Sequence, residues 1–218
     1  MLEKGAEPDG KVTLGMAEAG MCSNPPPEGP ETNTCEIVTH NPFLDCDLDG
    51  IGQNMADVTP LDLAASEGRL DVVKLLVEAG ADVNARSESW LRPLQFAIMN
   101  YRDNRLEIVR YLLERGASPN GRSKFGNYAL HQAAKTGDLA VARLLIEHGA
   151  LINAPNRYGI TPLHVAAKED HANIIALLLA HGADPSPRDD CGATPLAWAR
   201  HDKMPCAEMV LLKHHAEN

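Results

Sequence analysis

The chain has 218 residues, of which 44% are hydrophobic and 23% are charged. This fraction of hydrophobic residues can build a core, so we do not expect the entire chain to be disordered. The net charge is −10, and residues 1–57 carry −9 of it, because eleven acidic residues there face two lysines, while residues 58–218 carry −1. Phosphate contacts need clustered cations, so the first quarter of the chain is a poor surface for nucleic acid or an anionic membrane.

The sequence predicts an intracellular protein without a membrane span. The longest apolar run, residues 174–180, is far shorter than the roughly 20 residues that cross a bilayer. Residues 1–7 lack the apolar core of a signal peptide. The five cysteines form no C-x-x-C pair, and there is no Asn-x-Ser/Thr sequon. We therefore expect a monomer in a reducing compartment, cytoplasmic or nuclear, with no membrane and no nucleic acid among its partners.

The first motif along the chain is a near match to a phosphate-binding loop. Residues 5–12 almost fit G-x-x-x-x-G-K-[ST], but Val12 stands where the metal-binding hydroxyl belongs. Only four residues precede the motif, too few for the strand that such a loop follows. We do not interpret it as a nucleotide site.

The second motif is an acidic loop. Asp45, Asp47 and Asp49 alternate and are followed by Gly50, as in calcium loops of the EF-hand type. The twelfth position, which supplies a bidentate Glu in those loops, is Ala56 here. We interpret the segment as a solvated acidic loop, and weak calcium binding is the alternative.

From residue 58 onward the sequence is dominated by an internal repeat. Residues 59–65 read Thr-Pro-Leu-Asp-Leu-Ala-Ala, and related segments begin at residues 92, 128, 161 and 194. Their central leucines are 33, 36, 33 and 33 residues apart. Gly-Ala pairs that begin at residues 80, 116, 149 and 182 keep the same phase, with spacings of 36, 33 and 33. Two markers with one period indicate stacked structural units.

Each unit is predicted to contain two helices and a protruding turn. Thr is a favoured N-cap, and Pro follows it at the first helical position. Gly68 and Gly137 can end first helices in the left-handed conformation. A second helix with apolar residues at helical spacing follows and ends at the Gly-Ala pair. A polar stretch such as residues 153–159 then forms the turn. One unit cannot bury its own apolar face, so the units must stack into an all-α solenoid.

These motifs resemble the ankyrin repeat family, whose signature is Thr-Pro-Leu-His-x-Ala-Ala at a period of 33 residues. The resemblance covers five units over residues 58–218. Unit two has Arg92 for the capping Thr and three extra residues around positions 100–103, and unit three has Tyr128-Ala129 for Thr-Pro. Unit five ends on His215-Ala216 instead of Gly-Ala, within a polar sequence that suits a capping repeat.

Residues 1–57 have two interpretations. Residues 2–10 match residues 113–121 at six of nine positions, which favours a degenerate, partly disordered N-terminal repeat interrupted by the Pro-containing segment 25–30. Pro42 would cost its second helix about 3 kcal/mol. The alternative is an acidic disordered tail.

The histidines are predicted to be structural. His148, His181 and His214 recur at 33-residue spacing, but packed helices lie about 8–10 Å apart and metal ligands about 2 Å from the ion, so they cannot share a metal. We expect them to bond carbonyls at helix ends. The family resemblance implies hydrogen bonds between turns for His131 and His164.

Nothing in the sequence indicates an enzyme. It contains no G-x-S-x-G, H-E-x-x-H or dinucleotide-binding fingerprint. Cys191 and Cys206 lack an activating base and are interpreted as ordinary thiols. We expect no catalytic residue, no metal and no cofactor.

The predicted binding residues lie on the turns. Cations recur at matched positions, and aromatic residues stand beside or in place of the turn glycine, a combination that suits carboxylates and apolar anchors. The alternative is that the turns are simply polar and the aromatic rings fold back. The resemblance also implies that the ends of the first helices face partners. The candidates are Arg86, Trp90, Arg122, Lys124, Phe125, Arg157, Tyr158 and Arg188 on the turns, and Lys135 and Lys168 on the helices.

The sequence therefore predicts a non-catalytic protein-binding module, an adaptor or scaffold, whose partner carries acidic and apolar residues. Two alternatives stay open. The acidic loop could bind calcium weakly, or residues 1–57 could lie over the basic turns and mask them.

Overall fold

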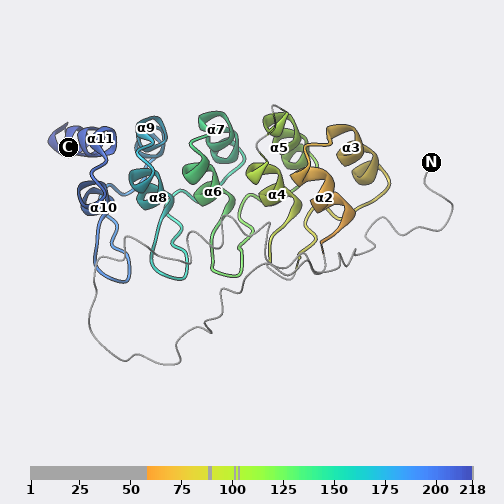
Figure 1. Cartoon of the computed structure of the whole chain (residues 1–218), viewed down its shortest axis with the longest axis horizontal. Helices are drawn as coiled ribbons and strands as arrows, with labels where there is room; N and C mark the ends of the chain where they lie inside the picture. The colour runs from red at the N-terminus through yellow and green to blue at the C-terminus, as the bar shows by residue number, and fades with distance from the viewer. Residues whose placement is uncertain (1–57, 88–89, 101, 103, 218) are drawn as a thin grey trace, which may run out of the picture.

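The structure, a computed structural model, describes residues 58–87, 90–100, 102 and 104–217, which form ten helices and no strand. The helices pair into five units that follow one another in a row, and the connecting turns all project to the same side (Figure 1). The predicted all-α solenoid is confirmed. The helices are α2 (Pro60–Ser66), α3 (Leu70–Glu78), α4 (Pro93–Met99), α5 (Arg105–Glu114), α6 (Ala129–Thr136), α7 (Leu139–Glu147), α8 (Pro162–Lys168), α9 (Ala172–Ala180), α10 (Pro195–His201) and α11 (Pro205–Glu217).

The first helices of units one and five begin with the predicted cap bond. Thr59 caps α2 by accepting the Asp62 N–H at 3.1 Å, and Thr194 caps α10 by accepting the Ala197 N–H at 3.3 Å. Arg92, Tyr128 and Thr161 also occupy extended N-cap positions, but none of these side chains forms a cap bond. The fourth motif residue bonds the N-cap backbone with or without the Thr cap: the His131 Nδ1 accepts the Tyr128 N–H at 3.2 Å, and the Asp62 Oδ2 accepts the Thr59 N–H at 2.9 Å.

That fourth residue also ties each first helix to the next turn. The Ile160 carbonyl accepts the Asn156 N–H at 2.8 Å and the Nε2–H of His131 at 3.0 Å. The Ala193 carbonyl is bonded in the same way by the Asp189 N–H and by the His164 Nε2, at 3.0 and 3.1 Å. The implied structural role of the two motif histidines is confirmed.

Unit one breaks this pattern, because Asp62 occupies the histidine position. The corresponding carbonyl, that of Leu91, accepts the Ser87 N–H at 3.0 Å. Asp62 is fully buried; its Oδ2 accepts the N–H and the hydroxyl of Thr59, both at 2.9 Å, while its Oδ1 has no hydrogen-bond partner among the described residues. Desolvation raises the pKa of Asp62 from 3.8 to about 6, against the lowering effect of the Thr59 bonds.

The loops within units also link neighbours. Gly68 and Gly137 take left-handed φ values of 72° and 70°, and in units four and five Asp170 and Lys203 take 58° in their place. The Asp170 Oδ1 accepts the N–H of Ala207 in α11 at 2.7 Å. The extra residues of unit two lie in the loop 100–104 between α4 and α5.

Near the start of three turns, an asparagine side chain bonds to the next unit, and we call this set of bonds the asparagine ladder. The Asn120 Nδ2 donates to the Gly149 carbonyl at 3.0 Å, and its Oδ1 accepts the Leu151 N–H at 3.0 Å. Asn84 makes the equivalent bonds to Gly116 and Ser118 at the end of unit two, and Asn153 makes them to Gly182 and Asp184 at the end of unit four. These bonds fix the spacing of successive turns.

The second helices of the first and last units, α3 and α11, expose apolar side chains. In α3, Leu75 is 60% exposed, whereas the equivalent Leu144 and Leu177 are 4% and 7% exposed in the interior of the row. The last helix, α11, exposes Met209 and Leu212 as well as the expected polar residues. The proposed degenerate repeat, the phosphate-loop match and the acidic loop all lie outside the described residues.

Candidate functional site

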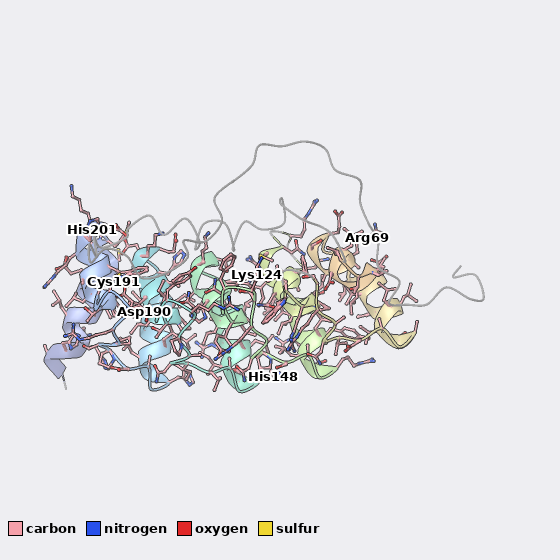
Figure 2. All side chains as sticks on the ribbon, turned by 90° about the horizontal axis from the view of Figure 1, so that it is seen from below. Arg69, Lys124, His148, Asp190, Cys191 and His201 are labelled. Carbon is pink, nitrogen blue, oxygen red and sulfur yellow. The ribbon has the colours of Figure 1, made fainter. Side chains whose placement is uncertain are left out.

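The four connecting turns form one face, which we call the turn row; its described residues are 81–87, 90–92, 117–128, 150–161 and 183–194. Figure 2 views the molecule from this side: Lys124, Asp190 and Cys191 lie over the row, while His148 lies at the edge opposite Arg69 and His201. The first helices pack directly behind the turns, and the second helices are farther away (Figure 1).

Backbone and side-chain bonds hold the turns to one another. The Arg157 N–H donates to the Phe125 carbonyl at 3.1 Å, and the Asp190 N–H donates to the Tyr158 carbonyl at 3.0 Å. Buried between the turns, the Asn156 Nδ2 donates to the Asn127 Oδ1 at 2.9 Å. These bonds join the second, third and fourth turns to one another within the chain.

The five cations predicted on the row are exposed but differ in what they contact. Arg122 bends onto its own turn, with its Nε 2.5 Å from the Tyr128 hydroxyl. Arg188 donates from an Nη to the Gly192 carbonyl at 2.8 Å. Arg86 and Arg157 instead approach the indole ring of Trp90, with their Cζ atoms 5.8 and 6.0 Å from its centroid.

The three aromatic candidates also differ. Trp90 is 45% exposed, whereas Phe125 and Tyr158 are half-buried, and Tyr158 packs against the hydrophobic core. Of the two interpretations for the rings, folding back describes Tyr158, and display toward solvent describes Trp90.

The helix candidates lie apart from the turn tips. Lys135 and Lys168 are half-buried in the last turns of α6 and α8, at the end of each helix that is far from its preceding turn. The carbonyl of Lys135 accepts from the His171 Nε2 at 3.0 Å. These two residues therefore flank the turn row at the ends of the first helices.

One further cation lies at the end of the first turn, Arg92, which the sequence analysis treated only as a departure at the cap. Its Nη1 donates to the Asn84 Oδ1 at 3.3 Å, and its Nε is buried without a hydrogen-bond partner among the described residues. Desolvation first, and then the charge of Arg86, lower the pKa of Arg92. The replacement of the capping Thr by a cation beside Arg86 was the available signal.

Besides Asp62 and Arg92, the described residues with a shifted pKa are two buried histidines and a thiol. Burial lowers the pKa of His131 to about 4 and also lowers that of His164, so both stay neutral as hydrogen-bonding groups. A hydrogen bond that the Cys206 thiol donates to the Asp170 carboxylate raises the pKa of the thiol, which is the opposite of activation. Among the residues that the structure describes, no group of three or more His, Cys, Asp or Glu side chains could hold a metal ion.

The repeated histidines correct one expectation. His148 and His181 occupy the C-caps of α7 and α9, as their spacing predicts, but both are exposed, and within the described chain neither ring bonds a carbonyl. The backbone N–H groups of His148 and His181 donate to the Leu144 and Leu177 carbonyls at 3.1 and 3.2 Å, so these helix ends are bonded without the rings.

The helices of the described residues were also tested as membrane spans, and none is both long and apolar enough to cross a bilayer.

Comparison with known proteins gives three matches. A family model described as ankyrin repeats in three copies matches residues 94–189 and 159–218, and one described as ankyrin repeats in many copies matches residues 61–102. The chain is also similar to alpha-latrocrustotoxin-Lt1a from Latrodectus tredecimguttatus, with 47% identity over 45 residues. This last match covers 21% of the chain and 3% of the toxin.

Proposed function

The chain belongs to the ankyrin repeat family, whose members are generally protein–protein interaction modules and typically non-catalytic, and from this premise we propose that it is an adaptor or scaffold that holds a protein partner on its turn row. The flanking ends of the first helices, with Lys135 and Lys168, form the second part of the surface. Residues 58–218 act as the binding unit.

The observation that carries this proposal is the hydrogen-bonded turn row. The turns are tied by the Arg157–Phe125 and Asp190–Tyr158 backbone bonds, and the asparagine ladder fixes their spacing. A surface that is already ordered loses little conformational entropy on binding, so more of the contact energy appears as affinity. Exposed cations on it favour acidic partners and a salt-sensitive association.

The test compares two variants with equal loss of charge. The turn-row variant carries Arg86→Gln, Arg122→Gln, Lys124→Gln and Arg157→Gln. The helix-face control carries the same change at four exposed cations on second helices, which are Lys74, Arg110, Arg143 and Lys213. Each chain is used for affinity capture from cell extract with quantitative mass spectrometry.

We expect one set of proteins to be retained by the wild type and by the helix-face control and to be lost by the turn-row variant. If the turn-row variant retains the same set, the turn row is not the binding surface. A set lost equally from both variants would show that net charge, and not the turn row, determines capture.

A further inference from the structure

The first turn differs from the others at one backbone position. Gly126, Gly159 and Gly192 occupy it in the second, third and fourth turns, with φ values of 85°, 71° and 79°. The first turn has Trp90 there, with φ of 60°. Residues with a β-carbon rarely adopt this conformation, and a bulky one adopts it only at a cost in backbone energy. Because the indole is 45% exposed, burial in the core does not account for it.

Two guanidinium groups from different turns meet at this indole. Arg86 comes from the same turn, and Arg157 reaches it from the third turn, past the second. Gly126 permits this approach: a β-carbon there would lie 2.9 Å from the Arg157 backbone nitrogen and 3.2 Å from its Cγ. Three turns thus cooperate to place two cations around one exposed ring.

Among the described residues, no carboxylate forms an ion pair with Arg86 or Arg157. Arg92 is a third cation nearby: desolvation and the charge of Arg86 lower its pKa, while the charge of Asp82 raises it. Like charges held together around a hydrophobic ring favour the binding of an anion that carries an apolar neighbour.

We propose that Arg86, Trp90 and Arg157 form a binding site for an acidic peptide segment in which a carboxylate side chain lies next to an apolar one. The guanidinium forks donate to the carboxylate, and the apolar side chain packs on the exposed indole surface. This site rests on the proposed function and identifies the part of the turn row that selects the partner.

The fourth turn favours a short acidic segment over a long polyanion. It carries Asp184, Asp189 and Asp190 with Arg188 as its one cation, and Asp190 lies on the same face as Lys124 (Figure 2). A nucleic acid that followed the whole row would meet these carboxylates, whereas a peptide centred on the first three turns would not.

The experiment selects ligands without assuming a partner. A random linear peptide library is selected on the full chain, and the enriched peptides are titrated by fluorescence anisotropy. The test variants are Arg86→Gln with Arg157→Gln, and Trp90→Gly, which restores the residue found in the other turns. Arg110→Gln with Arg143→Gln is the matched control. We expect enriched peptides to place Asp or Glu beside Leu, Phe or Trp, and Kd to rise about tenfold in both test variants and to stay within about twofold in the control.

A thermal melt of Trp90→Gly separates binding from folding. Relief of the backbone conformation should leave Tm equal to or above that of the wild type while binding is lost, whereas lost binding together with a lower Tm would indicate a structural role and overturn the inference. Peptides that bind the two test variants normally but not the turn-row variant would overturn this site and leave the proposed function intact. Peptides indifferent to every variant would overturn both. Enriched peptides without acidic residues, or equal binding of a single-stranded DNA oligonucleotide, would overturn the carboxylate specificity.

Discussion

Asp62→Asn should stabilise the protein near neutral pH, although it alters a fully buried residue of the repeat motif. Among the described residues the carboxyl Oδ1 of Asp62 has no hydrogen-bond partner, whereas units three and four place an N–H donor of His131 or His164 at the equivalent position. Asn keeps an oxygen for the Thr59 bonds and supplies an N–H that can donate to the Leu91 carbonyl. The substitution also removes the buried negative charge that Asp62 carries when it is ionised.

The magnitude follows from the pKa. Burial raises the pKa of Asp62 from 3.8 to about 6, which corresponds to about 3 kcal/mol. Between these two values the folded chain binds a proton that the unfolded chain has released. The stability that the protonated carboxyl provides is therefore complete below pH 3.8 and is lost as pH rises through about 6. Asp62→Asn should gain up to about 3 kcal/mol near pH 8 and much less near pH 4.

Urea unfolding followed by circular dichroism, at several pH values, measures this difference. The other titratable groups, including His131, are common to wild type and variant and largely cancel in the comparison. Asp71→Asn serves as a control, because its carboxylate is 74% exposed and its loss should change stability by less than about 1 kcal/mol at any pH. The reasoning is refuted if Asp62→Asn is less stable than the wild type near pH 8, or if the difference does not depend on pH.

Two further substitutions test the links between units. Asn120→Ala removes two inter-unit hydrogen bonds and should lower the free energy of unfolding by about 1–2 kcal/mol. The control Asn173→Ala, at an exposed position of α9, should change it by less than about 0.5 kcal/mol. Equal effects of the two variants in urea titrations would show that the asparagine ladder does not stabilise the array. Gly137→Ala should destabilise more than Gly149→Ala by about 1–2 kcal/mol. Both glycines have positive φ, but a β-carbon at Gly137 meets the His171 ring at 2.6 Å and one at Gly149 meets nothing within 4 Å. Indistinguishable Tm values for the two variants would contradict that prediction.

The sequence predicted the architecture because two markers recur at one period, and the physics behind each marker is local. Thr at the N-cap, Pro at the first position and Gly in the left-handed conformation act within a few residues, so Thr59, Thr194 and Gly137 could be placed without tertiary information. The left-handed conformations of Asp170 and Lys203 could not be predicted in this way, since neither residue type is specific for that conformation.

The site was predictable only in part. Alignment of the units brought Arg86, Trp90 and Arg157 onto one row, because equivalent positions stack. It could not show that Arg157 passes Gly126 to reach Trp90, nor that Arg122 and Arg188 bond within their own turns. Those contacts depend on how far individual side chains extend between units, which the repeat period of the sequence does not determine.

The most direct test of the binding surface is the Kd of a captured partner, measured by calorimetry for the wild type, the turn-row variant and the helix-face control at two salt concentrations. If the turn row holds the partner, Kd rises about tenfold or more in the turn-row variant, changes little in the control, and rises with salt in the wild type. An unchanged Kd in the turn-row variant would contradict the central claim.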